Sequence, residues 1–392
     1  MLRIVSALVA GTVLMSCGSH EPQHSHGSSY ELESVDELRN FFGNPLKPKE
    51  RPTQTYRGES VPVIDIHLHP GTFESMGPLG QDFVMKAINV PWLPDSIKKL
   101  GLSVLSKFMI SPYGFGIGIQ QECLRAKISY CGLFAVHAPE TWGVTSNNDI
   151  IKALDDRKNY MFGDSPYFFG LATVNMQQWI DDPAQSAEEL AEALQHPYIV
   201  GIKLAFIHNN WPLNDRRFDG VYELAAQYDI PIYHHTGSSP LRNLDSFATE
   251  EEAQRYLSSY DPSGLKEIVA AHPRTKFIMG HMGYDFTGEG NNFMPIVLDL
   301  AESYPNVYLE MSAFGKKSHD PDGSFFSGVL IEVKDRGLVD RLIYGSDGPG
   351  FPGGTKSYME TTLEALDRAD YSYEEAYQVL YKNFKTLSQL EG

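Results

Sequence analysis

The side chains best suited to hold a metal ion stand at the ends of short apolar runs. His67 and His69 end the run VPVIDIHLH, and Asp347 lies near the end of RLIYGSDG. Because side chains alternate along a strand, His67 and His69 point the same way and can share one ion. A lone histidine in such a place is usually a hydrogen-bonded structural residue. A group of histidines with a carboxylate is costly to bury unless paired or metal-bound, so the combination predicts a metal site.

Other polar side chains occupy equivalent positions in the remaining runs. Lys203 lies in YIVGIKLAF, His234 and His235 lie in IPIYHHTG, and His281 lies in KFIMGHMG. Alternation does not choose between His234 and His235, because both faces of a barrel strand are buried. All of these residues are candidates for the same site.

These residues need a scaffold that brings the ends of many strands together. Eight runs are apolar along most of their length, as expected for parallel strands buried on both faces: 61–69, 130–138, 167–175, 198–206, 230–237, 276–283, 307–314 and 341–348. Amphipathic helical patterns separate them, as at 186–195, 218–228 and 374–384. This α/β alternation predicts a (β/α)8 TIM barrel, whose sites lie at the C-terminal ends of the strands. A doubly wound open sheet is the alternative, but no glycine-rich phosphate fingerprint follows the first run.

One connection is much longer than an ordinary loop. About sixty residues separate His69 from the second run, and we assign 70–128 as a cap insertion over the site, with short helices. An oligomer interface made by the same segment is the alternative, and the two are compatible.

The N-terminus is typical of an exported chain. Arg3 precedes an apolar run too short to span a bilayer comfortably, as in a secretory signal. The run ends in LMSC, which resembles the bacterial lipoprotein cleavage box and implies a signal peptide at 1–17 with lipidation of Cys17. Gly18 follows where an inner-membrane retention signal needs aspartate, so we expect the outer membrane. An ordinary signal peptide with an incidental cysteine is the alternative.

The division of the chain follows from these features. Residues 18–58 are expected to be a polar tether and a docking helix around SVDELRNFF, and residues 59–392 the barrel domain. In an exported chain Cys123 and Cys131 could form a disulfide, and two buried thiols are the alternative. The formal net charge of −18 argues against binding to nucleic acid. It does not exclude a small-molecule substrate, because a local site can oppose the global charge.

Five motifs in order resemble a known family. DIHLHP, VGIKL, IPIYHHTG, FIMGHMG and YGSDGP are similar to those of the amidohydrolase superfamily, in the branch that includes aminocarboxymuconate-semialdehyde decarboxylase and related hydrolases. The resemblance covers about residues 60–390. It implies that His67, His69, His235 and Asp347 bind a divalent metal, with zinc favoured by ligand type and manganese also suitable.

The same resemblance assigns roles in catalysis. Asp347 would also accept a proton from the attacking water, and His281 would position or polarise the reacting group. One essential metal is expected. A second could bind through a carboxylated Lys203 and His281. The branch often has a histidine two residues after this lysine, where Ala205 stands here.

The departure at Ala205 leaves the substrate side of the site open. His208 follows five residues after Lys203, and both His208 and His234 stay candidates for contact with substrate or a second metal.

The resulting hypothesis is a metal-dependent hydrolase of an ester, lactone or amide in a small organic molecule. The alternative is a non-oxidative decarboxylase, with Arg125, Arg216 and Arg217 as candidate anchors for the substrate acid. A third class, a binding protein with a degenerate barrel, is disfavoured by the intact set of ligands. The family resemblance also suggests a homodimer.

Overall fold

The computed structural model describes residues 45–87, 92–109, 118–314, 320–349 and 353–390. The expected signal peptide 1–17, Cys17 and the expected helix around SVDELRNFF lie outside these described residues. Within the described part, residues 54–61 form a small antiparallel hairpin of β1 (Gln54–Tyr56) and β2 (Glu59–Val61). The Tyr56 hydroxyl donates to the Tyr371 carbonyl at 2.8 Å, which ties this hairpin to the C-terminal part of the chain.

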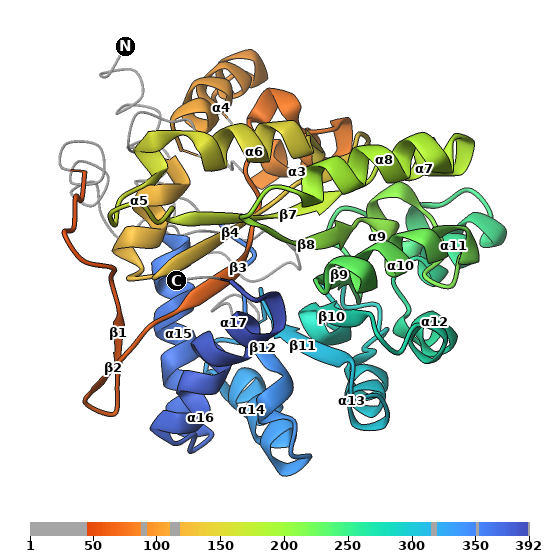
Figure 1. Cartoon of the computed structure of the whole chain (residues 1–392). Coiled ribbons are helices and arrows are strands. Elements are labelled where there is room, and N and C mark those ends of the chain that lie inside the picture. The colour runs from red at the N-terminus through yellow and green to blue at the C-terminus, as the bar shows by residue number, and fades with distance from the viewer. Residues whose placement is uncertain (1–44, 88–91, 110–117, 315–319, 350–352, 391–392) are drawn as a thin grey trace.

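Eight parallel strands form one sheet, as the eight apolar runs predicted (Figure 1). They are β3 (Ile64–Leu68), β4 (Tyr130–Phe134), β7 (Phe168–Thr173), β8 (Ile199–Leu204), β9 (Pro231–His235), β10 (Lys276–Gly280), β11 (Val307–Met311) and β12 (Leu342–Tyr344). Each strand pairs in parallel with the next, in chain order from β3 to β12. The order and direction confirm the predicted TIM barrel and exclude the doubly wound alternative.

Helices cover the outside of the strands (Figure 1). They are α6 (Asn147–Asp155), α7 (Met176–Asp181), α8 (Pro183–Leu194), α10 (Asp219–Tyr228), α11 (Glu250–Ser258), α12 (Leu265–Ala271), α13 (Met294–Ser303), α14 (Ser324–Asp335), α15 (Gly354–Arg368), α16 (Tyr373–Tyr377) and α17 (Asn383–Ser388). Among the described residues, none of these helices has both the length and the apolar character needed to cross a bilayer.

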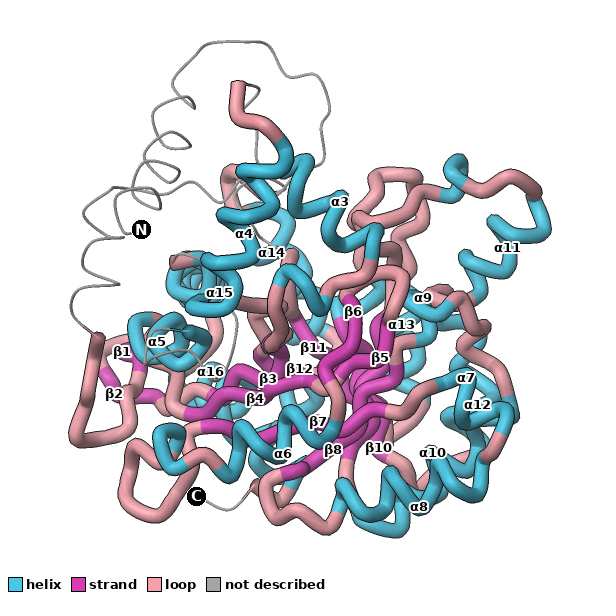
Figure 2. The backbone as a smooth tube through the Cα atoms, turned by 90° about the horizontal axis from the view of Figure 1, so that it is seen from above, coloured by secondary structure: helices cyan, strands magenta, loops and turns pink. Residues whose placement is uncertain are grey.

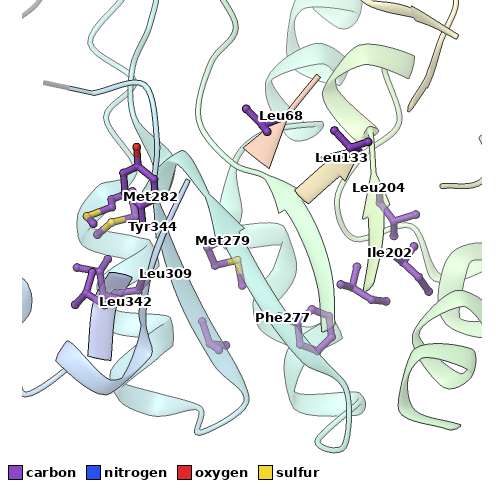
Figure 3. Close-up of a cluster of buried hydrophobic side chains, with 14 of the residues drawn as sticks. Leu68, Leu133, Ile202, Leu204, Phe277, Met279, Met282, Leu309, Leu342 and Tyr344 are labelled. Carbon is purple, nitrogen blue, oxygen red and sulfur yellow. The ribbon is translucent and has the colours of Figure 1, made fainter. Parts of the chain in front are cut away.

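Alternate strand residues serve two hydrophobic clusters. Phe277 and Met279 belong to the cluster between strands and helices, part of which is drawn in Figure 3. Ile278, between them in sequence, belongs to the inner cluster together with Phe134 and Tyr233. This alternation determines which polar side chains on the same strands point into the barrel.

Backbone and side-chain hydrogen bonds, with a single bridge, join β3 to β12. Leu68 pairs with Gly348, and the His69 N–H donates to the Gly348 carbonyl at 2.7 Å. Asp65, fully buried, accepts from the N–H groups of Ser346 at 3.0 Å and His67 at 3.1 Å through Oδ1. Burial raises the pKa of Asp65 to about 6. The carboxyl group therefore takes the place of ladder bonds where the first and last strands meet.

The segment 70–128, for which a cap insertion is expected, contains helices in its described part. They are η1 (Phe73–Ser75), α3 (Pro78–Ala87), α4 (Asp95–Met109) and α5 (Gly118–Arg125). Figure 2 shows α3 and α4 together on one side of the molecule. The run at 130–138 divides into β4 and β5 (Val136–Ala138), and β5 pairs with β6 (Gly143–Thr145). The hairpin turn accepts backbone hydrogen bonds from the cap, including Gly77 N–H to the Thr141 carbonyl at 2.8 Å.

The two candidate disulfide cysteines are free. Cys123 on α5 and Cys131 on β4 are both buried thiols in this structure, the alternative left open by the sequence.

The closure of the barrel gives a testable prediction at Asp65. Replacement by alanine leaves two buried N–H groups without their acceptor, so Asp65→Ala should lower the free energy of unfolding by roughly 2–4 kcal/mol. Asp65→Asn keeps an acceptor at Oδ1 and should retain most of the stability. Urea unfolding of the three proteins measures the difference. Equal midpoints for the alanine variant and the parent would show that the closure does not depend on this carboxyl group.

Candidate active site

Three polar side chains from the first and last strands meet at the rim of the barrel. The His67 Nε2 and His69 Nε2 atoms are 3.0 Å apart. Each lies close to Asp347 Oδ1, at 3.4 Å for His67 and 3.3 Å for His69. His67 is fully buried, whereas the side chains of His69 and Asp347 are each 27% exposed. Residues far apart in sequence therefore form one compact group of nitrogen and oxygen donors.

His281 approaches the same group from β10. One donor atom from each of His67, His281 and Asp347 lies within 4.8 Å of the others. His281 has φ of 59° and Asp347 has φ of 55°, a left-handed backbone that is uncommon in residues other than glycine. Strained backbone of this kind clusters at functional sites, where surrounding structure holds a side chain in place.

Burial keeps the imidazoles of this group uncharged. It lowers the pKa of His67 well below its usual value, although Asp347 opposes the shift. Burial likewise lowers the pKa of His281 to about 4 and that of His69 below its usual range. Two neutral imidazoles whose Nε2 atoms are 3.0 Å apart beside a carboxylate can direct lone pairs at one cation when their protons are on Nδ1. This donor set suits a divalent cation, since imidazole and carboxylate are ligands for zinc and manganese.

His235 lies beside the group and makes a different contact. Its ring centroid is 4.4 Å from that of His281, and its Nε2 lies 3.1 Å from the Ser238 carbonyl oxygen. His235 is therefore adjacent to the donors of His67, His69 and Asp347, with one nitrogen directed to the loop after β9. The compact donor group contains His67, His281 and Asp347, and His235 lies beside it next to His281.

His234 points away from the site. Its ring stacks on Phe206 and Phe277, with centroids 5.4 and 6.0 Å away, and also packs near Tyr222. Burial alone lowers the pKa of His234 to about 3. The strand alternation that places Tyr233 in the inner cluster turns its neighbour His234 outward. The structure thus separates the two adjacent histidines that the sequence alone could not distinguish.

Lys203 and His208 flank the group on the side of β8. The Lys203 Nζ lies 4.6 Å from the centroid of the Phe134 ring, and burial lowers the pKa of Lys203 to about 7 against the opposing influence of Asp347 and Glu310. His208 is buried on the short α9 (Phe206–Asn209), with its ring 5.5 Å from His235 and 6.5 Å from Trp142. Both residues accordingly border the candidate site.

Two of the expected acid anchors are engaged elsewhere. Arg216 donates to Asp219 at 2.8 Å, and Arg217 donates to Asp215 at 2.9 Å, next to the start of α10. These pairs fit the local structure of a helix start. The third candidate anchor, Arg125, is the last residue of α5.

A layer of buried polar residues below His67 was not predicted from the sequence. Glu310 Oε1 lies 3.2 Å from His67 Nδ1, and the Tyr233 hydroxyl lies 3.0 Å from the same nitrogen. The Ser312 hydroxyl donates to Glu310 Oε2 at 2.8 Å and faces His281 Nδ1 at 2.8 Å. Burial raises the pKa of Glu310 to about 8, and the hydrogen bonds from His281 and Ser312 oppose this shift. The available signal was one glutamate in the otherwise apolar strand VYLEM.

The fold and the rim of donors agree with a comparison to protein families. The family model described as Amidohydrolase matches residues 152–383, well over half of the 392 residues. The chain belongs to this family, and its barrel is that of an amidohydrolase-family enzyme. The match includes His235, His281 and Asp347, whereas His67 and His69 precede it. No curated protein matches the chain.

Solved structures share the barrel at low sequence identity. An uncharacterised TIM-barrel protein from Bordetella bronchiseptica is 15% identical, with a TM-score of 0.54 over 84% of this chain and 100% of that one. A probable 2-pyrone-4,6-dicarboxylic acid hydrolase from Acinetobacter baumannii is 14% identical, with a TM-score of 0.52 over 84% and 99%. A 5-carboxyvanillate decarboxylase from Novosphingobium aromaticivorans, complexed with manganese, is 17% identical, with a TM-score of 0.54 over 88% and 100%. These similarities establish a common fold.

The buried Lys203 predicts a pH dependence of stability. The unfolded chain holds the lysine proton up to about 10.5, whereas the folded chain releases it near 7, so the unfolded state binds more protons between these values. The free energy of unfolding of chelator-treated protein should therefore rise by roughly 2 kcal/mol from about pH 7 to about pH 9 through this group. Urea unfolding of Lys203→Met should lack this increment. Lys266→Met, at an exposed lysine of α12, should retain it. Parallel pH profiles for the parent and Lys203→Met would contradict the assignment.

Proposed function

We propose that this protein is a metal-dependent hydrolase that cleaves an ester, lactone or amide bond in a small organic substrate. The observation that carries the proposal is the convergence of His67 Nε2 and His69 Nε2 on Asp347 Oδ1, at 3.4 and 3.3 Å, at the rim of the barrel. Membership of the amidohydrolase family supports it. The partial exposure of Asp347 allows its carboxylate to exchange a proton with solvent.

The proposed holders of the ion are His67, His69, His235 and Asp347. A divalent ion there would supply Lewis acidity, which lowers the pKa of bound water to roughly 7 and polarises a carbonyl group. Zinc is proposed from the mixture of imidazole and carboxylate donors, and manganese suits the same donors. His235 would have to exchange its contact with the Ser238 carbonyl for the ion.

In this proposal Asp347 transfers the proton and His281 orients the attacking water. Asp347 accepts the proton of the attacking water and returns it to the leaving group. The Nδ1 atom of His281 faces the Ser312 hydroxyl oxygen at 2.8 Å, and this hydroxyl already donates to Glu310. His281 therefore holds its proton on Nδ1 and directs the Nε2 lone pair towards the site, where it orients the water. Donation by His281 to a developing oxyanion would instead need a proton on Nε2.

One essential metal is proposed, with Lys203 as the residue that would admit a second. Carboxylation of a lysine needs the neutral amine, and burial lowers the pKa of Lys203 to about 7, which makes part of the amine neutral near physiological pH. The Lys203 Nζ lies over the Phe134 ring, which favours the charged ammonium. A charged Lys203 could equally contact an anionic group of the substrate. Elemental analysis should accordingly find one tightly held ion per chain.

A non-oxidative decarboxylase is the second candidate. Lys203 and His208 both border the site, and a lysine ammonium there could hold the carboxylate of an acidic substrate. The manganese-bound structural relative named above is a decarboxylase. A panel of esters, lactones, amides and aromatic acids separates the two reactions by their products. Hydrolysis releases an alcohol or amine, or opens a lactone, whereas decarboxylation releases carbon dioxide. Release of carbon dioxide would support the decarboxylase and contradict the hydrolase.

Replacing Asp347 tests the proposed base directly. Asp347→Asn removes the proton acceptor while preserving the shape of the side chain, so turnover should fall by at least about 100-fold with the fold intact. Initial rates on the substrate found in the panel, with circular dichroism for the fold, measure the effect. Asp335→Asn, at an exposed carboxyl of α14, is the matched control and should retain parental rates. Near-parental turnover in Asp347→Asn would remove this residue as the base.

We also propose that the chain is exported and attached to the outer membrane by lipid on Cys17, facing the periplasm or the cell surface. The support is the sequence LMSC followed by Gly18. A homodimer, suggested by the family resemblance, is part of the same proposal. The barrel would then work on small molecules close to the membrane surface.

Substitution of Cys17 tests the anchor. Cys17→Ser removes the thiol that accepts the lipid, so the protein should leave the membrane fraction of bacteria that express it. Immunoblots of separated membrane and soluble fractions measure the shift, and metabolic labelling with a fatty acid should disappear. Cys123→Ser, at a buried thiol of the barrel domain, is the control and should keep both label and location. Unchanged fatty-acid labelling of Cys17→Ser would refute the anchor.

A further inference from the structure

Glu310 lies at the centre of a buried set of hydrogen-bond donors. Its Oε2 accepts from the His281 backbone N–H at 3.1 Å, the Ser312 hydroxyl at 2.8 Å and the Tyr233 hydroxyl at 3.2 Å. Its Oε1 faces His67 Nδ1 at 3.2 Å. Glu310 is 0% exposed, so no solvent competes for these contacts. An ionised carboxylate accepts only, so it can accept from all four neighbours at once.

This arrangement determines which nitrogen of His67 carries the proton. The Tyr233 hydroxyl donates to Glu310, so its oxygen can only accept from His67 Nδ1. The Ser312 hydroxyl also donates to Glu310, and it lies 3.3 Å from the same nitrogen. Every neighbour of His67 Nδ1 is therefore an acceptor, which places the proton on Nδ1. The Nε2 atom is left with a lone pair aimed at His69 and Asp347.

We propose that Glu310 is a positioning residue that fixes the metal-binding tautomer and ring orientation of His67. The inference rests on the proposed function, because the Nδ1–H tautomer of His67 is needed only if Nε2 binds a metal ion. Histidine ligands generally donate their second N–H to a carboxylate or carbonyl, and loss of that partner typically weakens metal binding by about 10–100-fold. Here the carboxylate comes from β11, which pairs with β12, and the segment after β12 meets β3 where the barrel closes. Glu310 therefore reaches His67 from a strand that is not its direct neighbour.

Two glycines show that the fold makes room for this contact. A Cβ atom on Gly345 would lie 1.9 Å from Glu310 Oε1, and one on Gly280 would lie 2.0 Å from the Tyr233 hydroxyl oxygen. Neither glycine has a positive φ, so the backbone conformation does not require glycine at these positions. The lack of space for a Cβ atom does. Both occur in the motifs that carry His281 and Asp347. The ring of Phe134, 4.5 Å from that of His67, packs against the same imidazole.

Substitution by glutamine is the sharpest test. In Glu310→Gln the amide oxygen must serve the three donors at the Oε2 position, so the amide NH2 group faces His67 and donates to Nδ1. The proton of His67 then moves to Nε2, which can no longer bind an ion. We expect the affinity for Zn²⁺, measured by competition with a chelator, to fall about 10–100-fold. We also expect the nitrogen NMR signals of His67 in metal-free, histidine-labelled protein to change from the Nδ1–H to the Nε2–H tautomer.

Tyr233→Phe is the matched comparison. It removes the other close neighbour of His67 Nδ1 but leaves Glu310 in place, so the Nδ1–H tautomer should persist and Zn²⁺ affinity should change far less than in Glu310→Gln. Glu310→Asp keeps the negative charge, but its shorter side chain moves the carboxylate away from His67 Nδ1. Zn²⁺ binding should therefore weaken. That variant decides the matter if Glu310→Gln does not fold. Parental tautomer and affinity in the folded glutamine variant, or in the aspartate variant in its place, would overturn the proposal.

The experiment separates this proposal from the proposed function. A parent protein that binds no divalent ion would refute the metal-dependent hydrolase. The tautomer of His67 is measured without metal and would still test Glu310 in that case.

Discussion

The junction between β3 and β12 is the contact on which the candidate site depends. His67 and His69 lie on the first barrel strand and Asp347 follows the last, so they can meet only if the sheet closes. The closure uses few backbone bonds, namely the Leu68–Gly348 bridge with its neighbours, together with the buried Asp65. A carboxyl group that accepts from both strands sets their register at this point. The same register places Asp347 Oδ1 within 3.4 Å of two imidazole nitrogens.

Burial then determines the chemical character of the residues that the closure assembles. Imidazoles in a dry site lose their charge, because a low-dielectric surrounding disfavours the protonated ring. Neutral rings have lone pairs, and the hydrogen bonds at the opposite nitrogens determine where those lone pairs point. Glu310 and Ser312 provide these bonds for His67 and His281 from one strand, β11, and its end. The donors of the candidate site and the groups that orient them are therefore held by the same parallel sheet.

The sequence was sufficient to predict the barrel and much of its polar rim. Eight apolar runs with helical patterns between them correspond to the eight parallel strands, because burial on both faces leaves a clear mark in composition. The two adjacent histidines could not be told apart, since a one-residue difference in register exchanges the inner and outer faces. The aromatic stack around His234 resolves that choice only in three dimensions. Glu310 was missed because a single acidic residue in an apolar strand has no partner in the sequence that reveals its role.

The division between strands and loops separates the donors of the candidate site from the residues that surround them. His67, His235 and the approach to Asp347 are fixed by strands whose positions the barrel dictates. The β5–β6 turn and α9 lie outside those strands, and they bring the Trp142 ring to 6.5 Å from the His208 ring. The hydrogen bonds between the cap and the hairpin turn couple these loops to one another. Lys203 and His208 border the donors without belonging to them, and Trp142 packs near His208. Under the proposed function these are the side chains placed to distinguish a carbonyl substrate from a carboxylic acid.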